Sequence, residues 1–328
     1  MLKEINASFP ATSPRRPSYK RYKLQCPDDD TLFADLIAPD PPTALLSTSS
    51  GPQLPFPSSE KDMPNQSIQA QTFRALHVPG HPLVLFNVWD AGSAKAVAAG
   101  GARALATGSW SVAAAHGFTD GEQMPFDLCL ANLQRIVGAT DLPVTIDLES
   151  GYGADPAAVG DTVARALRAG AIGCNIEDSL PENGSLREAS EQTARLKAAR
   201  AAADELGILA FLNARTDVFF QTGPEHHDEG MLEAALERGR IYADAGADGL
   251  FVPRLADERL IGRLVEASPL PVNIMVGGTT PPAARLAELG VARISHGPGP
   301  YILAMVALET AARAAFAGGD PSPRKALT

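Results

Sequence analysis

Lysine and cysteine are both scarce in this sequence. Seven of the 328 residues are lysine, and the formal net charge at pH 7 is −10. Binding to nucleic acid needs clustered Lys and Arg side chains, so this charge balance argues against DNA or RNA as a partner. The three cysteines, Cys26, Cys129 and Cys174, form no Cys-X-X-Cys pair. The sequence therefore predicts neither a disulfide framework nor a structural zinc site, and it indicates a reducing, cytoplasmic location.

Long apolar runs are also missing. No segment approaches the roughly 18 consecutive apolar residues that a membrane helix needs. The N-terminal residues lack the compact apolar core of a secretory signal. Hydrophobic residues nevertheless make up 45% of the chain, which is enough to bury a substantial core. The composition predicts a globular protein without a membrane partner.

The first 66 residues lack any sustained hydrophobic period. They contain "SPRRPS", "CPDDD" and "STSSGPQLPFPSSE", a mixture of Pro, Ser and charge that cannot bury enough surface to offset its ordering entropy. We therefore predict a disordered N-terminal extension over residues 1–66. One folded domain is expected over 67–318, and a flexible C-terminal tail over 319–328.

Beyond that segment, short apolar runs alternate with helical patterns. The runs that predict strands cover 83–89, 104–110, 144–150, 171–178, 209–216, 249–254, 271–276 and 292–297. The Ala- and Leu-rich segments between them have a helical period, and several end on a glycine that can cap a helix. Eight βα units over about 245 residues are typical of a parallel (β/α)8 TIM barrel, whereas a doubly wound sheet usually stops earlier.

Acidic side chains occur where several predicted strands end. Asp147 and Glu149 close one run, Glu177 closes the next, and Asp120 lies in the loop after the second. In such a barrel the C-terminal strand ends form the functional rim. Two carboxylates about 4 Å apart repel by roughly 4 kcal/mol at an effective dielectric near 20, so this cluster needs protons or a cation. Oxygen donors favour Mg²⁺, with Mn²⁺ as an alternative. A second interpretation, in which these acids cap the helices that follow, stays open.

Five short motifs then resemble a known family. "FNVWDAGSA", "ATGSWSVAAAHG", "IDLESGYG", "NIEDS" and "NARTD" occur in this order. Together they resemble the isocitrate lyase/phosphoenolpyruvate mutase superfamily, in particular its phosphoenolpyruvate-mutase-like, or phosphonomutase, branch. The resemblance covers about residues 70–315. It implies a barrel whose eighth helix is exchanged between subunits, usually in a homotetramer built as a dimer of dimers.

The resemblance also implies roles for individual residues. Asp147 matches the direct ligand of a Mg²⁺ ion, and the acids that hold the metal's waters match Glu149, Glu177 and Asp120. Glu149 departs from the family pattern, which often has Asp there. Ser109 and Trp110 match the turn that binds a substrate carboxylate. Arg215 matches the arginine that faces the substrate's other anionic group, so Arg215 and Asp120 are the candidate catalytic residues.

This set of residues suits the chemistry of 2-oxo acids. Such a substrate chelates Mg²⁺ through its carbonyl and carboxylate oxygens, and the ion stabilises the enolate left when a neighbouring bond breaks. Breaking a carbon–carbon bond gives a lyase, and breaking a carbon–phosphorus bond gives a phosphonate enzyme. A Schiff-base aldolase is disfavoured, because no predicted strand carries a lysine.

The loop at 179–196 bears on which bond breaks. It lacks the Lys-Lys-Cys-Gly-His type sequence of isocitrate and methylisocitrate lyases, and its "ENGSLRE" only partly resembles the gating loop of phosphonate enzymes. We therefore expect a carbon–carbon lyase acting on a small, oxaloacetate-like 2-oxo or 2-hydroxy acid. One alternative is a phosphonate enzyme of the phosphoenolpyruvate mutase, carboxyvinyl-carboxyphosphonate phosphonomutase or phosphonopyruvate hydrolase type. The other is a non-catalytic barrel that only binds its ligand.

Overall fold

The computed structural model describes residues 20–21, 37–38 and 63–319 of the chain. The chain divides into two compact units, Met1–Phe56 and Pro57–Thr328. In the first unit, β1 (Lys20–Arg21) pairs in antiparallel fashion with β2 (Ile37–Ala38). Most of the segment predicted to be disordered, and the tail from residue 320, lie outside the described residues. The domain boundaries proposed from the sequence therefore stay predictions.

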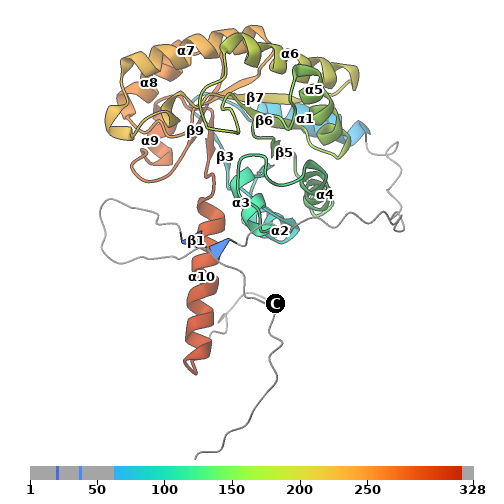
Figure 1. Ribbon diagram of the computed structural model, residues 1–328, viewed down its shortest axis with the longest axis vertical. Coiled ribbons are helices and arrows are strands. Elements are labelled where there is room, and N and C mark those ends of the chain that lie inside the picture. The colour runs from blue at the N-terminus through green and yellow to red at the C-terminus, as the bar shows by residue number, and fades with distance from the viewer. Residues whose placement is uncertain (1–19, 22–36, 39–62, 320–328) are drawn as a thin grey trace, which may run out of the picture. The chain divides into compact units, whose positions relative to one another are not determined.

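The second unit contains eight parallel strands that form a barrel (Figure 1). They are β3 (Leu83–Leu85), β4 (Leu105–Ala106), β5 (Val144–Asp147), β6 (Gly173–Glu177), β7 (Phe211–Arg215), β8 (Gly249–Phe251), β9 (Val272–Met275) and β10 (Arg293–Ser295). Neighbours in the chain pair from β4 to β10, and β10 pairs with β3. Between β3 and β4 the ring closes through a parallel bridge of Val88 with Thr107. The predicted (β/α)8 barrel is confirmed.

All eight predicted strands extend past the C-terminal ends of the observed strands, and two of them show why. Ser109 and Trp110, placed in the second strand by their apolar neighbours, belong to the helix α3 (Ser109–Ala115). In the third strand the ladder stops at Asp147, and Glu149 has a φ of 50°. A residue in the left-handed region cannot continue an extended strand. The apolar pattern alone therefore predicts strands that continue past the residues at which the chain turns.

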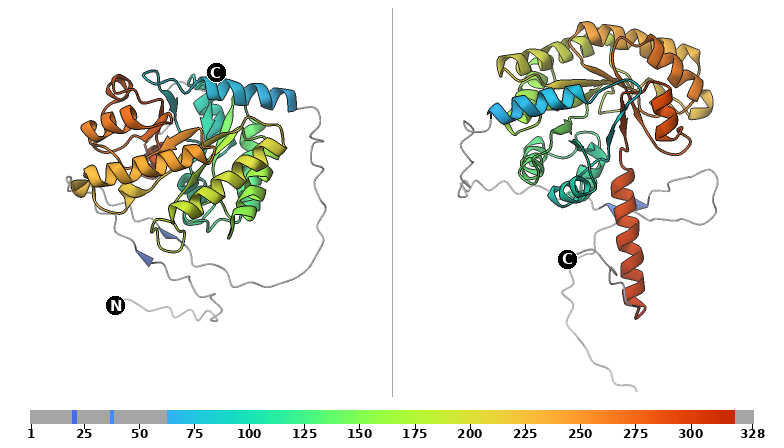
Figure 2. Two further views of the ribbon diagram at one scale, coloured as in Figure 1. Left: turned by 90° about the horizontal axis from the view of Figure 1, so that it is seen from above. Right: turned by 180° about the vertical axis from the view of Figure 1, so that it is seen from behind.

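Helices connect the strands and cover the outside of the barrel (Figures 1 and 2). In addition to α3 they are α2 (Ala91–Ala99), α4 (Phe126–Val137), α5 (Pro156–Arg168), α6 (Ala189–Glu205), α7 (Glu229–Asp244), α8 (Glu258–Ala267) and α9 (Ala283–Glu288), with short 3-10 turns η1 (Val218–Phe220) and η2 (Pro224–His226). Asp155 and Asp228 cap α5 and α7 by accepting a hydrogen bond from the third N–H of each helix. Gly170 and Gly246 follow these helices with positive φ, as predicted from the sequence.

Asparagine side chains fill part of the barrel interior below the rim. Asn213 Nδ2 donates to Asn175 Oδ1 at 2.9 Å and to Asn273 Oδ1 at 3.2 Å. Asn175 and Asn213 lie two residues before Glu177 and Arg215, and β6 and β7 pair in register over these positions. Because side chains alternate along a strand, Glu177 and Arg215 share the inward side with the asparagines. The last residues of β6 and β7 therefore face the barrel mouth.

A buried histidine lies at the opposite end of the barrel. Helix α1 (Met63–Ala75) brings Phe73 against Phe211, the first residue of β7, with ring centroids 5.6 Å apart. His77 stacks on the same Phe211 ring at 3.9 Å, and its Nδ1 lies 2.8 Å from Phe73 O. Burial, together with the nearby Arg293 charge, lowers the pKa of His77 to about 3. The folded chain therefore holds this histidine in its neutral form.

We expect His77 to make the folded chain sensitive to acid. An unfolded histidine titrates near 6.5 and the folded one has a pKa of about 3, so below pH 6.5 the unfolded state binds the proton first. The stability that His77 contributes is complete above pH 6.5 and is lost progressively as the pH falls toward 3. At pH 5 the loss is about 2 kcal/mol. Urea unfolding at pH 7 and pH 5 should show a smaller difference for His77→Phe than for the wild type. An equal difference in both proteins would contradict the assignment.

The last helix, α10 (Gly299–Phe316), differs from the others because it projects away from the barrel (Figures 1 and 2). Its side chains are exposed or only partly buried apart from Pro300 at its start, and Leu303 keeps 65% of its surface exposed. Val84 in β3 and Phe86 just after this strand are also exposed, at 46% and 38%. Within the described residues no helix is long and apolar enough to cross a membrane.

Candidate active site

The residues singled out from the sequence come together at the C-terminal ends of the strands. Asp147, Glu177 and Arg215 are the last residues of β5, β6 and β7. Strand pairing places Glu177 directly beside Arg215, and it places Asp147 beside Asn175. The barrel geometry alone thus brings two acids and one arginine to the same rim.

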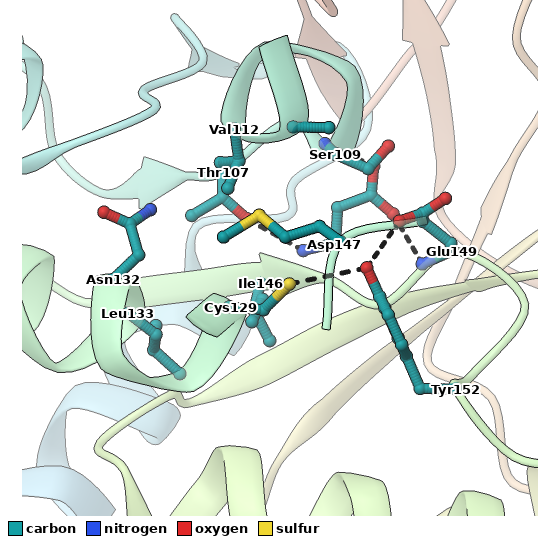
Figure 3. A pocket seen from close by; sticks show the side chains of 12 residues that line it. Thr107, Ser109, Val112, Cys129, Asn132, Leu133, Ile146, Asp147, Glu149 and Tyr152 are labelled. Carbon is teal, nitrogen blue, oxygen red and sulfur yellow. Dashed lines mark hydrogen bonds between the residues drawn. The ribbon is translucent and has the colours of Figure 1, made fainter. Parts of the chain in front are cut away.

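Asp147 is fixed by contacts from two neighbouring segments (Figure 3). Its backbone N–H donates to Thr107 Oγ1 at 3.0 Å, which ties the end of β5 to the end of β4. Its Oδ2 accepts a hydrogen bond from the Ser109 N–H at 3.3 Å, and its Oδ1 accepts one from the Glu149 N–H at 3.3 Å. Both hydrogen bonds are long. The carboxylate therefore keeps capacity for a stronger partner.

Glu149 lies in the turn after β5 and is almost completely buried. Its Oε2 accepts hydrogen bonds from the N–H groups of Gly121 and Glu122 at 2.7 and 2.6 Å, and its Oε1 accepts one from Tyr152 Oη at 2.6 Å. Burial raises the pKa of Glu149 to about 7, and the charges of Asp120 and Asp147 also act to raise it. The hydrogen bonds from Tyr152 and Glu122 act to lower it. The side chain thus fastens the loop after α3 to the β5 end.

Arg215 sits between two acids. Its guanidinium contacts Glu177 Oε2 at 2.6 Å and pairs with both carboxylate oxygens of Asp217, at 2.6 and 2.8 Å. Burial alone would lower the pKa of Arg215, but Glu177 and Asp217 together raise it above its ordinary value. Burial also raises the pKa of Glu177, although Arg215 opposes this effect. The arginine is therefore held rigidly and stays charged.

Asp120 completes the acid group from the loop after α3. Its pKa is raised, first because the surrounding protein limits its hydration and second because Asp147 carries a like charge. A hydrogen bond with the Ser109 side chain and the charge of Arg215 oppose this shift. These influences place Asp120 among Ser109, Asp147 and Arg215. The charges of neighbouring acids thus help to raise the pKa values of Asp120, Glu149 and Glu177.

The donor set suits a hard cation held largely through water. Among the described residues, no three His, Cys, Asp or Glu side chains are grouped closely enough to ligate one ion directly. Burial is the first cause of the raised pKa values of Asp120, Glu149 and Glu177, and neighbouring acids add to it, so a bound cation would favour the charged forms. Oxygen donors that reach the ion through water are the arrangement that Mg²⁺ prefers. The residues present therefore fit such an ion, with Asp147 as the candidate direct ligand.

A small cavity of about 20 Å³ lies beside the acids (Figure 3). One wall is polar and carries Thr107, Ser109, Asp147 and Glu149. The other wall is mostly apolar and includes Val112, Met124, Leu133 and Ile146. Asp147 and Glu149 therefore border a small void that is also lined by side chains of α3 and α4.

Ser109 and Trp110, the predicted carboxylate-binding pair, form the first turn of α3. The N–H of Ser109 points at Asp147, so this backbone amide is directed toward the acid cluster. Trp110 is half-buried, and its ring meets the Tyr301 ring edge-to-face at 5.9 Å. The turn therefore lies between the acid cluster and the start of α10.

The loop after β6 is compact. An antiparallel bridge pairs Ser179 with Leu186, and Gly184 at its tip has a φ of 72°. Gln221 Nε2 reaches across from the end of η1 to Gly184 O at 3.1 Å. Over this loop and up to residue 196 the chain carries no Cys, His or Lys. The loop therefore offers none of those groups as a proton donor.

Sequence reasoning missed three residues that shape the site. Asp217 pairs with Arg215, Tyr152 donates to Glu149, and Glu122 Oε1 accepts from Ser150 Oγ at 2.6 Å. The sequence does hold a signal for Asp217, because it ends the motif "NARTD" two residues after Arg215, and a buried arginine needs a partner. Tyr152 likewise lies within the motif "IDLESGYG", whereas Glu122 has no comparable signal.

Comparisons with known proteins match one family model and several related proteins. A family model described as phosphoenolpyruvate phosphomutase matches residues 73–316. A crystal structure from Burkholderia cenocepacia J2315, named a candidate phosphonomutase, is 59% identical, covers 77% of this chain and 100% of its own, and has a TM-score of 0.74. Uncharacterized protein Rv1998c of Mycobacterium tuberculosis is 37% identical over 77% of this chain and 92% of its own length. The 2-methylisocitrate lyase of Salmonella typhimurium is 29% identical over 64% and 72%.

Proposed function

Because this chain belongs to the phosphoenolpyruvate phosphomutase family, within the isocitrate lyase superfamily, we propose that it is a Mg²⁺-dependent carbon–carbon lyase. Its substrate class would be a small 2-oxo or 2-hydroxy carboxylic acid of the oxaloacetate type. The chain is an enzyme of the lyase or mutase kind, as its relatives are. The alternative of a non-catalytic barrel is therefore not retained.

One observation carries the proposal most directly. Asp147, Glu177 and Arg215 end neighbouring strands at one rim, and Asp147 and Glu149 also line a small cavity. Asp147 would bind the ion directly, and Asp120, Glu149 and Glu177 would hold its waters. When bound, a divalent ion supplies Lewis-acid stabilisation for negative charge that develops on the substrate oxygens.

The chain's own residues account for substrate orientation. The Ser109–Trp110 turn would receive one carboxylate through backbone N–H groups at the start of α3, where anions are favoured. Arg215, immobilised by Glu177 and Asp217, would face the substrate's second polar group with a fixed positive charge. A charge that is already held in place needs little rearrangement during the reaction, which lowers the free-energy barrier.

The loop after β6 favours a substrate whose departing group needs no proton. Because it provides no Cys, His or Lys, cleavage that releases carbon dioxide or another group needing no general acid suits the site best. The second candidate is a phosphonate enzyme, since the 59% identical neighbour is named a candidate phosphonomutase. Carbon–phosphorus cleavage would use the same acids and the same arginine.

A substrate screen separates the two candidates. Oxaloacetate, substituted malates and phosphonopyruvate would each be incubated with the purified protein and Mg²⁺, with and without EDTA, and the products identified by NMR. We expect a carbon–carbon product from a four- or five-carbon acid, and we expect EDTA to abolish its formation. Release of phosphate from phosphonopyruvate would select the second candidate instead. Turnover that persists in EDTA would contradict both.

We further propose that the protein is a homo-oligomer in which α10 packs on another subunit. The exposed apolar side chains of α10, of Val84 in β3 and of Phe86 just after it support this arrangement, because water-exposed apolar surfaces of this kind are typical of subunit contacts. A dimer of dimers is the assembly that the family resemblance implies.

A further inference from the structure

The start of α10 contacts the turn that we propose for substrate binding. Tyr301, in the first turn of α10, lies against both tryptophans of the chain. Its ring meets Trp89 at 5.1 Å with an interplanar angle of 86°, and it meets Trp110 at 5.9 Å with an angle of 80°. Edge-to-face arrangements of this kind are favourable and define ring orientation. Tyr301 thus links the loop between β3 and α2 to the substrate turn.

Two hydrogen bonds of the Asn87 side chain also join the segment before α10 to the segment before α3. The His296 N–H donates to Asn87 Oδ1 at 2.9 Å, and Asn87 Nδ2 donates to Thr107 O at 3.0 Å. Gly108, which precedes α3, has no side chain, and a Cβ there would lie 3.6 Å from Gly297 O. The segment that leads into α10 therefore runs directly past the residues that precede Ser109.

These contacts matter because α10 has few others within its own barrel. Pro300 is its buried residue, and the side chains beyond Tyr301 are exposed or only partly buried. The Tyr301 ring is accordingly a main point at which the projecting helix touches the site. A shift at the start of α10 would move the Tyr301 ring against the Trp110 ring.

We propose that Tyr301 is a positioning residue for the substrate turn. By bracing the Trp110 ring, it holds Ser109 and Trp110 in the geometry that receives a carboxylate. The inference rests on the proposed function, because it takes this turn to be the carboxylate site. It also implies that packing of α10 onto another subunit adjusts the affinity of the site.

Intrinsic fluorescence tests the bracing directly, since Trp89 and Trp110 are the only tryptophans of the chain. In a Trp89→Phe background all tryptophan emission comes from Trp110. We expect Tyr301→Leu to shift this emission, whereas Tyr301→Phe, which keeps the ring, should leave it unchanged. With Mg²⁺ present, oxalate, a planar dianion of enolate size, should bind about fivefold more weakly to Tyr301→Leu. The KM of Tyr301→Leu should rise by a similar factor, and its kcat should stay within about twofold of the wild-type value. This pattern is expected when a substitution weakens binding of the substrate and of the transition state equally.

Three results would bear against the proposal or its premise. Unchanged Trp110 emission and unchanged oxalate affinity in Tyr301→Leu would overturn it. Equal changes in Leu303→Ala, on the same helix but with 65% of its surface exposed, would assign the effect to the whole helix and overturn the role of Tyr301. If wild-type protein fails to bind oxalate, the proposed function fails, and the emission alone decides whether Tyr301 braces Trp110. Light scattering on each variant would show whether assembly has changed.

Discussion

Replacing Asp147 with Asn should lower kcat/KM by about 10³-fold or more while the protein stays folded. The loss of one carboxylate charge removes the candidate direct ligand, and Lewis-acid stabilisation by a metal is worth several kcal/mol. Asparagine is nearly isosteric, and the Asp147 backbone N–H, which donates to Thr107 Oγ1, is untouched. The measurement is steady-state turnover of the substrate identified by the screen, at saturating Mg²⁺, with thermal unfolding as the check on folding.

Asp161→Asn is the matched control for this variant. Asp161 lies on α5, in the same βα unit, and its side chain is exposed. The substitution changes the net charge by the same amount, so activity should match that of the wild type. Calorimetric titration with Mg²⁺ adds a readout that does not depend on turnover. Normal Mg²⁺ binding and near-normal activity in Asp147→Asn would refute the role of this residue.

The fold could be predicted because its signals are local. Each strand is a short apolar run, and the helices between strands carry their own period, with N-caps and terminal glycines at several of them. Gly170 and Gly246, for example, mark the ends of α5 and α7 in the sequence and adopt positive φ in the structure. Counting eight such units is enough to identify the barrel.

The details of the acid cluster could not be predicted in the same way, because they depend on distant contacts. Alternation assigns Glu149 to the strand, yet it lies in a left-handed turn. What holds it there are the N–H groups of Gly121 and Glu122, 28 and 27 residues away in the chain. Gly151 helps, since its φ of 112° is unfavourable for other residues. The sequence names the acids near the strand ends, but a periodic pattern does not reveal the loop that binds Glu149.

Arg215→Met should lower both the stability of the protein and its activity, and the two losses can be separated. The arginine is 16% exposed, and its partners Glu177 and Asp217 are 17% and 3% exposed. Removing it leaves two largely buried carboxylates without a counter-charge, which costs about 3–5 kcal/mol of unfolding free energy. Loss of the fixed positive charge opposite the substrate should reduce kcat/KM by about 10²-fold or more. Urea unfolding and steady-state kinetics measure the two quantities.

The double variant Arg215→Met with Asp217→Asn distinguishes a catalytic role from a structural one. The neutral amide that this variant carries at position 217 needs no counter-charge, so stability should recover in part, because the two residues contact each other and their effects are not additive. Activity should not recover, since the charge that faces the substrate is still absent. Arg200→Met provides the control, because Arg200 pairs with Asp248 and bonds to Ala210 O, just before the start of β7. It should lose stability while the kcat/KM of the folded protein stays near the wild-type value. If activity returned together with stability in the double variant, Arg215 would be a structural residue and the proposed site would lose its anion-facing group.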